Sequence, residues 1–230
     1  MTSKYQFHFS QGKINYDSQY HHLKFNRYFA DENYYQERAR LAKDQYFSQF
    51  FNESAKVLEF GCGLGQNIAL FKNRYGYDLN KDLYPLLKKK GIVTFNSLKE
   101  IPNNFFDEIL ISQVLEHLEQ PLETLKELQK KLKKEGHLRL VLPKPDVNPR
   151  LTGKEMNTTK DGHIYGGGFY EANHLLNLAG YQIIANKRIY HRGVDKLFSL
   201  SSVSYSFYKA LINFYGHIVN DFDLLIIAKK

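Results

Sequence analysis

The stretch Val57–Gly65, with the sequence VLEFGCGLG, decides the fold of this chain. Its first four residues form a short apolar run that fits a buried β-strand. Glycines at positions 61, 63 and 65 follow directly, and they remove side chains where a chain must turn sharply and where a ligand lies against the backbone. The stretch predicts a strand that runs into a ligand-binding turn, although a tight turn without a ligand would use the same glycines.

The spacing of these glycines argues against a dinucleotide site. The fingerprint of such sites, G-x-G-x-x-G, requires a glycine at its sixth position. This chain has Gln66 there, and its third glycine is Gly65. We expect a helix from about Gln66, whose free N–H groups and positive dipole end would face a carboxylate of the ligand.

Apolar runs and helical stretches alternate after residue 54, which predicts a parallel sheet with crossover helices. The expected strands are residues 57–60, 74–77, 92–95, 108–111, 137–142, 181–190 and 223–228. The clearest helix is 120–134, because Pro121 is favoured in a first turn and four leucines form one apolar face. Gly136 would end it. Further helices are expected at 169–178 and 205–215.

The chain divides into an N-terminal cap and a main domain. Residues 17–54 carry aromatic side chains at helical intervals, so we expect a helical cap over residues 1–54. The main domain would occupy residues 55–230. Prolines at 143, 145 and 149 break regular structure, and residues 150–168 contain five glycines, which predicts a long loop over the substrate at about 146–168.

The composition is that of a globular protein, with 43% hydrophobic and 24% charged residues. Cys62 is the only cysteine, which excludes an internal disulfide and favours a cytoplasmic setting. No Cys/His cluster has zinc spacing, so no metal site is expected. The N-terminus lacks the apolar stretch of a signal peptide, and no apolar run approaches the length of a transmembrane segment.

The net charge of +8 would suit nucleic acid, an anionic membrane surface or an anionic substrate. The lysine clusters at 88–90 and 130–134, however, fall at the ends of expected helices, where cations offset the helix dipole and stay solvated. The sequence contains no nucleic-acid-binding motif. We therefore do not expect a nucleic-acid partner.

A carboxylate ends the second expected strand. Asp78 follows Tyr75-Gly76-Tyr77, and it can accept hydrogen bonds from both hydroxyls of a ribose. Ligands of parallel sheets bind outside the carboxyl ends of the strands, so Asp78 would face the same crevice as the glycine turn. An acid in this position also serves often as a helix N-cap.

Three segments together resemble successive motifs of class I methyltransferases, notably the family with the V-L-E-H signature. They are Glu59–Gly65, Gly76–Asp78 and Phe106–Pro121, within residues 57 to about 142. The resemblance implies S-adenosylmethionine as cofactor. It also implies an α/β Rossmann-like three-layer sandwich, with a seven-stranded, mostly parallel sheet of order 3-2-1-4-5-7-6 whose seventh strand is antiparallel.

The resemblance also assigns the cofactor contacts. Glu59 and the Gly61–Gly65 backbone would hold the methionine part, Asp78 the ribose, the Asn96-Ser97-Leu98 turn the adenine, and Gln113 the sulfonium region. The residues expected to contact the cofactor are Glu59, Gly61, Cys62, Gly63, Gly65, Asp78, Leu79, Ser97, Leu98 and Gln113. Two features depart from the pattern: the short stretch before Asp78 leaves a first helix of about two turns, and Ser97 replaces a frequent acid.

Two residues inside these motifs are expected to be structural. Cys62 is common in the glycine motif, and we expect it to pack rather than to act as a nucleophile. His117 lies in the signature, and we expect it to form local hydrogen bonds that brace the turn from strand to helix.

The candidate catalytic residues lie in the loop after the fifth strand. A general base would assist transfer to a hydroxyl, a phenol or an acidic carbon. His163 is the first candidate, followed by Asp161 and Tyr165, and the glycines at 166–168 would permit a lid hinge. A structural loop with a hydrogen-bonded histidine is an equal alternative. In the cap, Tyr34, Tyr35 and Arg38 could close over the cofactor or pack in the core.

The sequence thus predicts methyl transfer to a small molecule, a carbohydrate or a lipid-linked glycan. A non-catalytic S-adenosylmethionine-binding regulator is an alternative, and a nicotinamide-dependent oxidoreductase a weaker one. The aromatic stretch 203–219 could pack internally, form a homodimer or contact a membrane surface.

Overall fold

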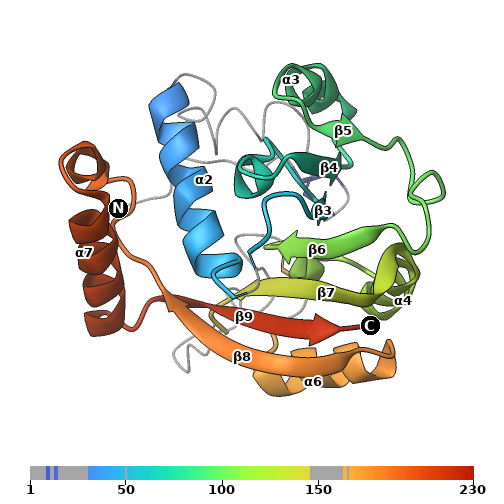
Figure 1. Cartoon of the computed structure of the whole chain (residues 1–230). Helices are drawn as coiled ribbons and strands as arrows, with labels where there is room; N and C mark the ends of the chain where they lie inside the picture. Colours follow the sequence, from blue (N-terminus) through green and yellow to red (C-terminus); the bar gives the residue numbers. More distant parts are fainter. Residues whose placement is uncertain (1–8, 11–12, 15–30, 50, 146–162, 165) are drawn as a thin grey trace.

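The fold is seen in a computed structural model, which describes residues 9–10, 13–14, 31–49, 51–145, 163–164 and 166–230. A seven-stranded sheet forms its centre, in the order β5-β4-β3-β6-β7-β9-β8 (Figure 1). Strands β5, β4, β3, β6 and β7 run parallel, and β9 is antiparallel to both of its neighbours. This confirms the expected order 3-2-1-4-5-7-6 with an antiparallel seventh strand.

The strands match the seven apolar runs of the sequence. Their bounds are β3 Lys56–Phe60, β4 Asn73–Tyr77, β5 Val93–Thr94, β6 Phe106–Ser112, β7 Leu132–Pro143, β8 Gln182–Tyr190 and β9 Phe222–Lys229. A separate antiparallel pair joins β1 (Phe9–Ser10) to β2 (Lys13–Ile14).

The helices form two layers around this sheet. The α-helices are α2 Glu32–Tyr46, α3 Tyr84–Lys89, α4 Pro121–Lys131, α6 Phe169–Leu178 and α7 Tyr205–Ile218. The 3-10 turns are η1 Gln66–Ile68, η2 Lys81–Leu83, η3 Leu115–His117 and η4 Phe198–Ser202. Helices α4 and α6 cover one face of the sheet, α2 and α3 cover the other, and α7 lies beyond the β8–β9 side (Figure 1).

The core alternates between the two faces along each strand, as a pleated strand requires. Leu58, for example, packs in the cluster with α4 and α6, while the adjacent Val57 packs in the cluster with α2. Both are fully buried. Helix α2, from the predicted cap, therefore supplies one layer of the sandwich itself.

The first crossover differs from the expected helix of about two turns. The residues between β3 and β4 contain only the single 3-10 turn η1. The guanidinium of Arg74 donates to the carbonyl oxygens of Ala69 and Phe71, and Phe71 turns inward to pack against Phe47 of α2. The predicted α-helix from Gln66 was therefore wrong, since only a 3-10 turn is present. The carbonyl oxygens of Ala69 and Phe71, which a longer helix would use for its own hydrogen bonds, are bound by Arg74 instead.

Two other helix ends also differ from expectation. The helix predicted over 120–134 ends at Lys131, because Leu132 is extended and pairs with Phe106 at the start of β6. The helix predicted over 17–54 ends at Tyr46 in the described part of the chain. Its segment before residue 31 lies outside the described residues.

A buried arginine ends α2. Arg139 of β7 is fully buried, and its guanidinium donates to the carbonyl oxygens of Tyr46 at 2.7 Å and Gln49 at 2.8 Å. Its Nε also donates to Oε2 of the buried Glu108 at 2.8 Å. One side chain thus satisfies the carbonyls at the end of a helix and balances a buried carboxylate.

Replacement of this arginine tests its role. Arg139→Met leaves the Glu108 carboxylate buried without its cation, so we expect the free energy of unfolding to fall by about 3–5 kcal/mol. Urea denaturation followed by circular dichroism measures it. The exposed Arg188 is a matched control, and Arg188→Met should cost less than about 1 kcal/mol. Equal losses in both variants would contradict this assignment.

Candidate active site

The conformation of the glycine turn after β3 strongly favours glycine. Gly61, Gly63 and Gly65 have φ angles of 74°, 49° and 71°. A Cβ atom on Gly61 would lie 2.3 Å from Cγ2 of Val114, and one on Gly65 would lie 2.2 Å from Cδ1 of Ile92. The positive φ angles at all three positions, together with the lack of space at Gly61 and Gly65, therefore favour glycine strongly over any residue with a side chain.

Asp78 ties the end of β4 to this turn. Its Oδ2 accepts a hydrogen bond from the backbone N–H of Gly63 at 2.8 Å, and its Oδ1 accepts one from Asn80 at 2.8 Å. The side chain is largely buried, with 7% of the residue exposed. Each carboxylate oxygen can accept a second hydrogen bond, so the group is fixed in place and still able to bind ligand hydroxyls.

Glu59 lies at the base of the turn and is almost fully buried. Its Oε1 accepts a hydrogen bond from Nδ2 of Asn67 at 2.6 Å, and its Oε2 makes no hydrogen bond among the described residues. Burial raises the pKa of Glu59 to about 8, against the opposing effect of the Asn67 hydrogen bond. The carboxyl group is therefore largely protonated at neutral pH and has one oxygen available to a ligand.

Cys62 packs inside the turn, as expected. It is 1% exposed, and burial raises the pKa of its thiol. A Cβ atom on Gly76 of β4 would lie 2.7 Å from its Sγ, so the thiol fills the space that this glycine leaves. A protonated thiol without solvent access is a poor nucleophile.

Tyr84 connects the end of β4 to the turn after β5. Its hydroxyl oxygen lies 2.6 Å from the carbonyl oxygen of Phe95 and 3.0 Å from that of Asp78, and the ammonium of Lys81 donates to it at 2.7 Å. The sequence analysis did not identify this tyrosine. Its hydroxyl places the segment that follows Phe95 beside the Asp78 carboxylate.

The residues predicted to hold an adenine ring lie around this junction. Leu79 is 69% exposed although it is apolar. Ser97 donates to Oε1 of Glu100 at 3.4 Å, and Leu98 is half-buried. The junction therefore presents an apolar side chain and a small polar one next to Asp78.

A second polar group lies where β6, β7 and β9 meet. Gln113 directly follows β6, has a φ angle of 56°, and lies close enough to the carboxyl group of Asp223 to lower its pKa. Its Nε2 makes no hydrogen bond among the described residues. The Nε2 of His191 lies 3.6 Å from Oδ2 of Asp223, and Arg38 of α2 faces the same carboxyl group. Burial raises the pKa of Asp223 to about 6, and the interaction with His191 opposes this rise.

Asp223 and His191 were not among the site residues expected from the sequence. The only signal was an acid among the apolar residues of the last strand, since a polar side chain at an inward-facing position has to be satisfied there. A positive φ angle at a non-glycine residue such as Gln113 is also typical of functional sites, but it is visible only in the structure.

The loop after β7 returns to the 3-10 turn η3. The backbone N–H of Ile164 donates to the carbonyl oxygen of Glu116 at 2.7 Å, and the rings of His163 and His117 have centroids 4.8 Å apart. His163 therefore reaches the V-L-E-H segment. Asp161 and Tyr165, the other two candidate catalytic residues, lie outside the described residues.

Tyr34 and Tyr35 of α2 pack rather than stand open. The hydroxyl of Tyr35 donates to the carbonyl oxygen of Leu64 in the glycine turn at 3.2 Å. The hydroxyl of Tyr34 donates to Asp195, and its ring contacts Phe198 with centroids 4.9 Å apart. Helix α2 thus supports the glycine turn from one face of the sheet.

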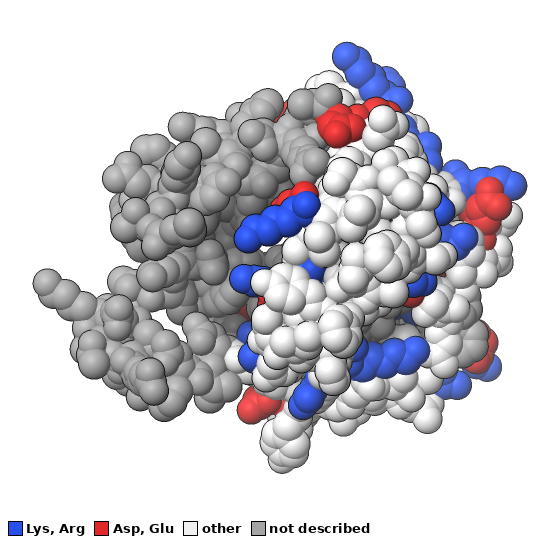
Figure 2. Space-filling model, turned by 90° about the vertical axis from the view of Figure 1, so that its left-hand side faces the viewer, with Lys and Arg blue, Asp and Glu red and all other residues white. Residues whose placement is uncertain are grey.

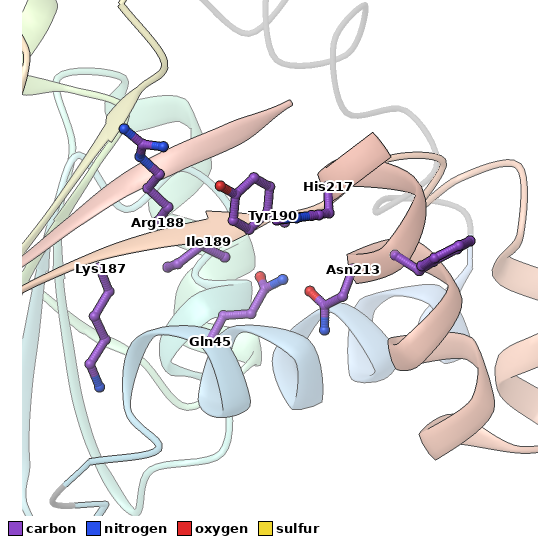
Figure 3. Close-up of a pocket in the computed structure, with 8 residues that line it drawn as sticks. Gln45, Lys187, Arg188, Ile189, Tyr190, Asn213 and His217 are labelled. Atoms are coloured by element: carbon purple, nitrogen blue, oxygen red, sulfur yellow. The ribbon is translucent and has the colours of Figure 1, made fainter. Parts of the chain in front are cut away.

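A separate groove of about 470 Å³ lies between α2, β8 and α7 (Figure 3). Its walls include Gln45, Arg188, Tyr190, Asn213 and His217. The amide groups of Gln45 and Asn213 point toward one another across it (Figure 3). Among the residues that the structure describes, none of those predicted to bind the cofactor or to act in catalysis lines this groove.

Three further observations concern the charged face, the apolar side chains of α7 and the length of the helices. Figure 2 shows lysine and arginine side chains spread over the described part of one face, between uncharged residues. Helix α7 buries Tyr208 and Ile212 but exposes Phe207 and Phe214. None of the helices that the structure describes is long and apolar enough to cross a bilayer.

Among known proteins, those that resemble this chain include methyltransferases. The family model described as "Methyltransferase domain" matches residues 27–202. A comparison with curated proteins gave no match.

Several solved structures share the fold. A SAM dependent methyltransferase from Archaeoglobus fulgidus is 23% identical, with a TM-score of 0.58, and the alignment covers 90% of this chain and 100% of that chain. The 1,6-didemethyltoxoflavin-N1-methyltransferase of Burkholderia thailandensis, with bound 1,6-didemethyltoxoflavin and S-adenosylhomocysteine, is 18% identical, with a TM-score of 0.57 and coverage of 93% and 84%. An S-adenosylmethionine dependent methyltransferase from Mesorhizobium loti is 12% identical, with a TM-score of 0.54 and coverage of 84% and 98%.

The buried Glu59 predicts a pH-dependent stability. The pKa of its carboxyl group is about 8 in the folded chain and has an ordinary value of 4.5, so the folded state binds the proton more tightly. The contribution of Glu59 to stability is therefore fully present below about pH 4.5 and is lost as the pH rises to about 8, at up to about 1.4 kcal/mol per pH unit.

Glu59→Gln should remove this component, because an amide does not titrate. Urea denaturation of both proteins between pH 6 and 9 measures the difference. Glu53→Gln, at an exposed position, is the control and should follow the pH dependence of the unmodified chain. Parallel curves for Glu59→Gln and the unmodified chain would show that Glu59 is already ionised in the folded state.

Proposed function

Because the chain belongs to the methyltransferase-domain family and is a class I S-adenosylmethionine-dependent methyltransferase, we propose that its cofactor lies across the ends of β3 and β4. The observation that carries this proposal is the hydrogen bond from the Gly63 amide to Asp78. This hydrogen bond holds the glycine turn after β3 and the acid at the end of β4 in a fixed relative position. Bound there, S-adenosylmethionine supplies an activated methyl group on a sulfonium ion.

Asp78 would hold the ribose. Its two carboxylate oxygens are 2.8 Å from different backbone N–H groups, so their positions are fixed before a ligand arrives. The remaining lone pairs suit the two hydroxyls of a ribose, which both donate. Prior ordering of this kind reduces the entropy lost on binding.

Glu59 and the turn Gly61–Gly65 would hold the methionine part. A cationic ammonium beside Glu59 favours the ionised carboxylate, which opposes the effect of burial. Binding of the cofactor would then release a proton from Glu59, and affinity would rise with pH below about 8. The exposed side chain of Leu79 and the turn at Ser97 and Leu98 would contact the adenine ring.

The acceptor would approach from the side of Gln113, where the methyl group is expected. We propose a small molecule, a carbohydrate or a lipid-linked glycan as the acceptor. Asp223 offers a proton acceptor on this side, because a carboxyl group with a pKa of about 6 is mostly ionised at pH 7 and still basic enough to take a proton. His163, the base predicted from the sequence, lies nearer to His117, and both remain candidates.

Alignment would supply much of the acceleration. Holding an acceptor oxygen in line with the methyl carbon and the sulfur is worth up to about 7–11 kcal/mol. The bond between methyl carbon and sulfur breaks as the bond to the acceptor forms, and the acceptor proton passes to the base. Gln113 would place the acceptor, and Asp223 or His163 would take its proton.

Asp78→Asn tests the cofactor site. The amide keeps one acceptor oxygen for the turn but loses the charge and one acceptor for the ribose, which is worth about 1.5–3 kcal/mol. We expect the Kd for S-adenosylmethionine to rise about 10- to 100-fold in calorimetric titration. We also expect a lower Tm, because one of the two backbone N–H groups bound by Asp78 loses its acceptor.

The matched control is Asp82→Asn, an exposed acid on η2. It should bind the cofactor as the unmodified chain does. Unchanged affinity of Asp78→Asn would refute the ribose assignment. Titration of the unmodified chain with NAD should give no binding, and formation of S-adenosylhomocysteine in the presence of a panel of acceptors identifies the acceptor class.

A further inference from the structure

Three side chains with metal-ligating atoms meet at the carboxyl edge of the sheet. Glu116 and His117 come from η3, directly after β6, and His163 comes from the segment after β7. One ligand atom from each, a carboxylate oxygen and two imidazole nitrogens, can be chosen so that all lie within 4.8 Å of one another. Glu116 is buried, and the two histidines are half-buried.

Backbone hydrogen bonds hold this cluster together. The N–H of Ile164 donates to the carbonyl oxygen of Glu116 at 2.7 Å, which fixes His163 against η3. The N–H of His117 donates to the carbonyl oxygen of Val114 at 3.0 Å. This hydrogen bond closes the turn η3, which carries both Glu116 and His117. The three side chains are therefore brought together by the main chain.

Two imidazoles and one carboxylate are typical ligands of divalent transition metals. With ligand bonds of about 2.0–2.2 Å, the ligand atoms of a tetrahedral site are about 3.4 Å apart. The present spread of 4.8 Å would have to close by about an ångström or slightly more, which side-chain torsions can supply.

The position of the cluster suggests its use. The same segment that carries η3 begins with Gln113, expected near the methyl group, and continues with Val114, which packs against Gly61 of the glycine turn. Three protein ligands leave at least one coordination position for another molecule. A metal ion there would face the acceptor side of the same crevice.

We propose that Glu116, His117 and His163 bind a divalent first-row transition-metal ion, which coordinates an oxygen of the methyl acceptor. This inference rests on the proposed function for the role of the ion, but not for its binding. Coordination would lower the pKa of an acceptor hydroxyl, so that its proton is released to solvent or to a nearby base. The oxygen would then form the new bond to the methyl carbon as the bond between that carbon and the sulfonium sulfur breaks, which leaves S-adenosylhomocysteine. His163 then acts as a ligand and not as the base.

The test measures metal binding directly, without activity. The full chain is stripped with a chelator and titrated with Mn²⁺, and free Mn²⁺ is followed by electron paramagnetic resonance. A parallel titration with Zn²⁺ uses calorimetry. We expect one equivalent to bind, and the affinity to fall at least tenfold in His163→Ala and in Glu116→Gln, which keeps the shape of the side chain.

The matched control is His174→Ala, an exposed histidine on α6 outside the cluster. It should bind the metal as the unmodified chain does, and the ion should raise the Tm of both proteins but not that of His163→Ala. No binding, binding unchanged in His163→Ala, or binding lost in His174→Ala would each overturn the proposal.

The same samples separate this inference from the proposed function. Binding of S-adenosylmethionine without binding of either metal would overturn the metal site alone. Metal binding without any binding of S-adenosylmethionine would overturn the proposed cofactor site and leave the metal site standing.

Discussion

The short crossover between β3 and β4 constrains the rest of the structure. Residues 61–72, all described, contain no α-helix that could cover their face of the sheet. Helix α2 covers it instead, with the hydroxyl of Tyr35 on the carbonyl of Leu64 and the ring of Phe47 against Phe71. The N-terminal helix and the glycine turn are consequently one structural unit, and the geometry of the cofactor site depends on both.

The sequence predicted the sheet well and the helix ends poorly, for a physical reason. Apolar runs and glycine turns are local signals, so the seven strands and their order followed from the sequence and the family resemblance. The helix ends depend on distant side chains. Arg74 takes the carbonyls that would have extended the first crossover helix, and Arg139 takes those at the end of α2.

The difference between local signals and long-range contacts also separates the cofactor half of the site from the acceptor half. The cofactor half could be predicted because the glycine turn and Asp78 each follow a strand directly, and the carboxyl ends of parallel strands meet. The acceptor half is assembled from segments far apart in the chain. Asp223 meets Gln113, and His163 meets Glu116, through pairing and loop contacts that no spacing in the sequence reveals.

The bond from Arg139 to Tyr46 also has a consequence for synthesis on the ribosome. The two residues are 93 positions apart, and translation at about 5–20 residues per second separates their appearance by about 5–20 s. An isolated helix of this length is only marginally stable in water. The end of α2 therefore lacks the Arg139 side chain that binds its carbonyls during that interval, and a chaperone would protect this nascent segment until β7 appears.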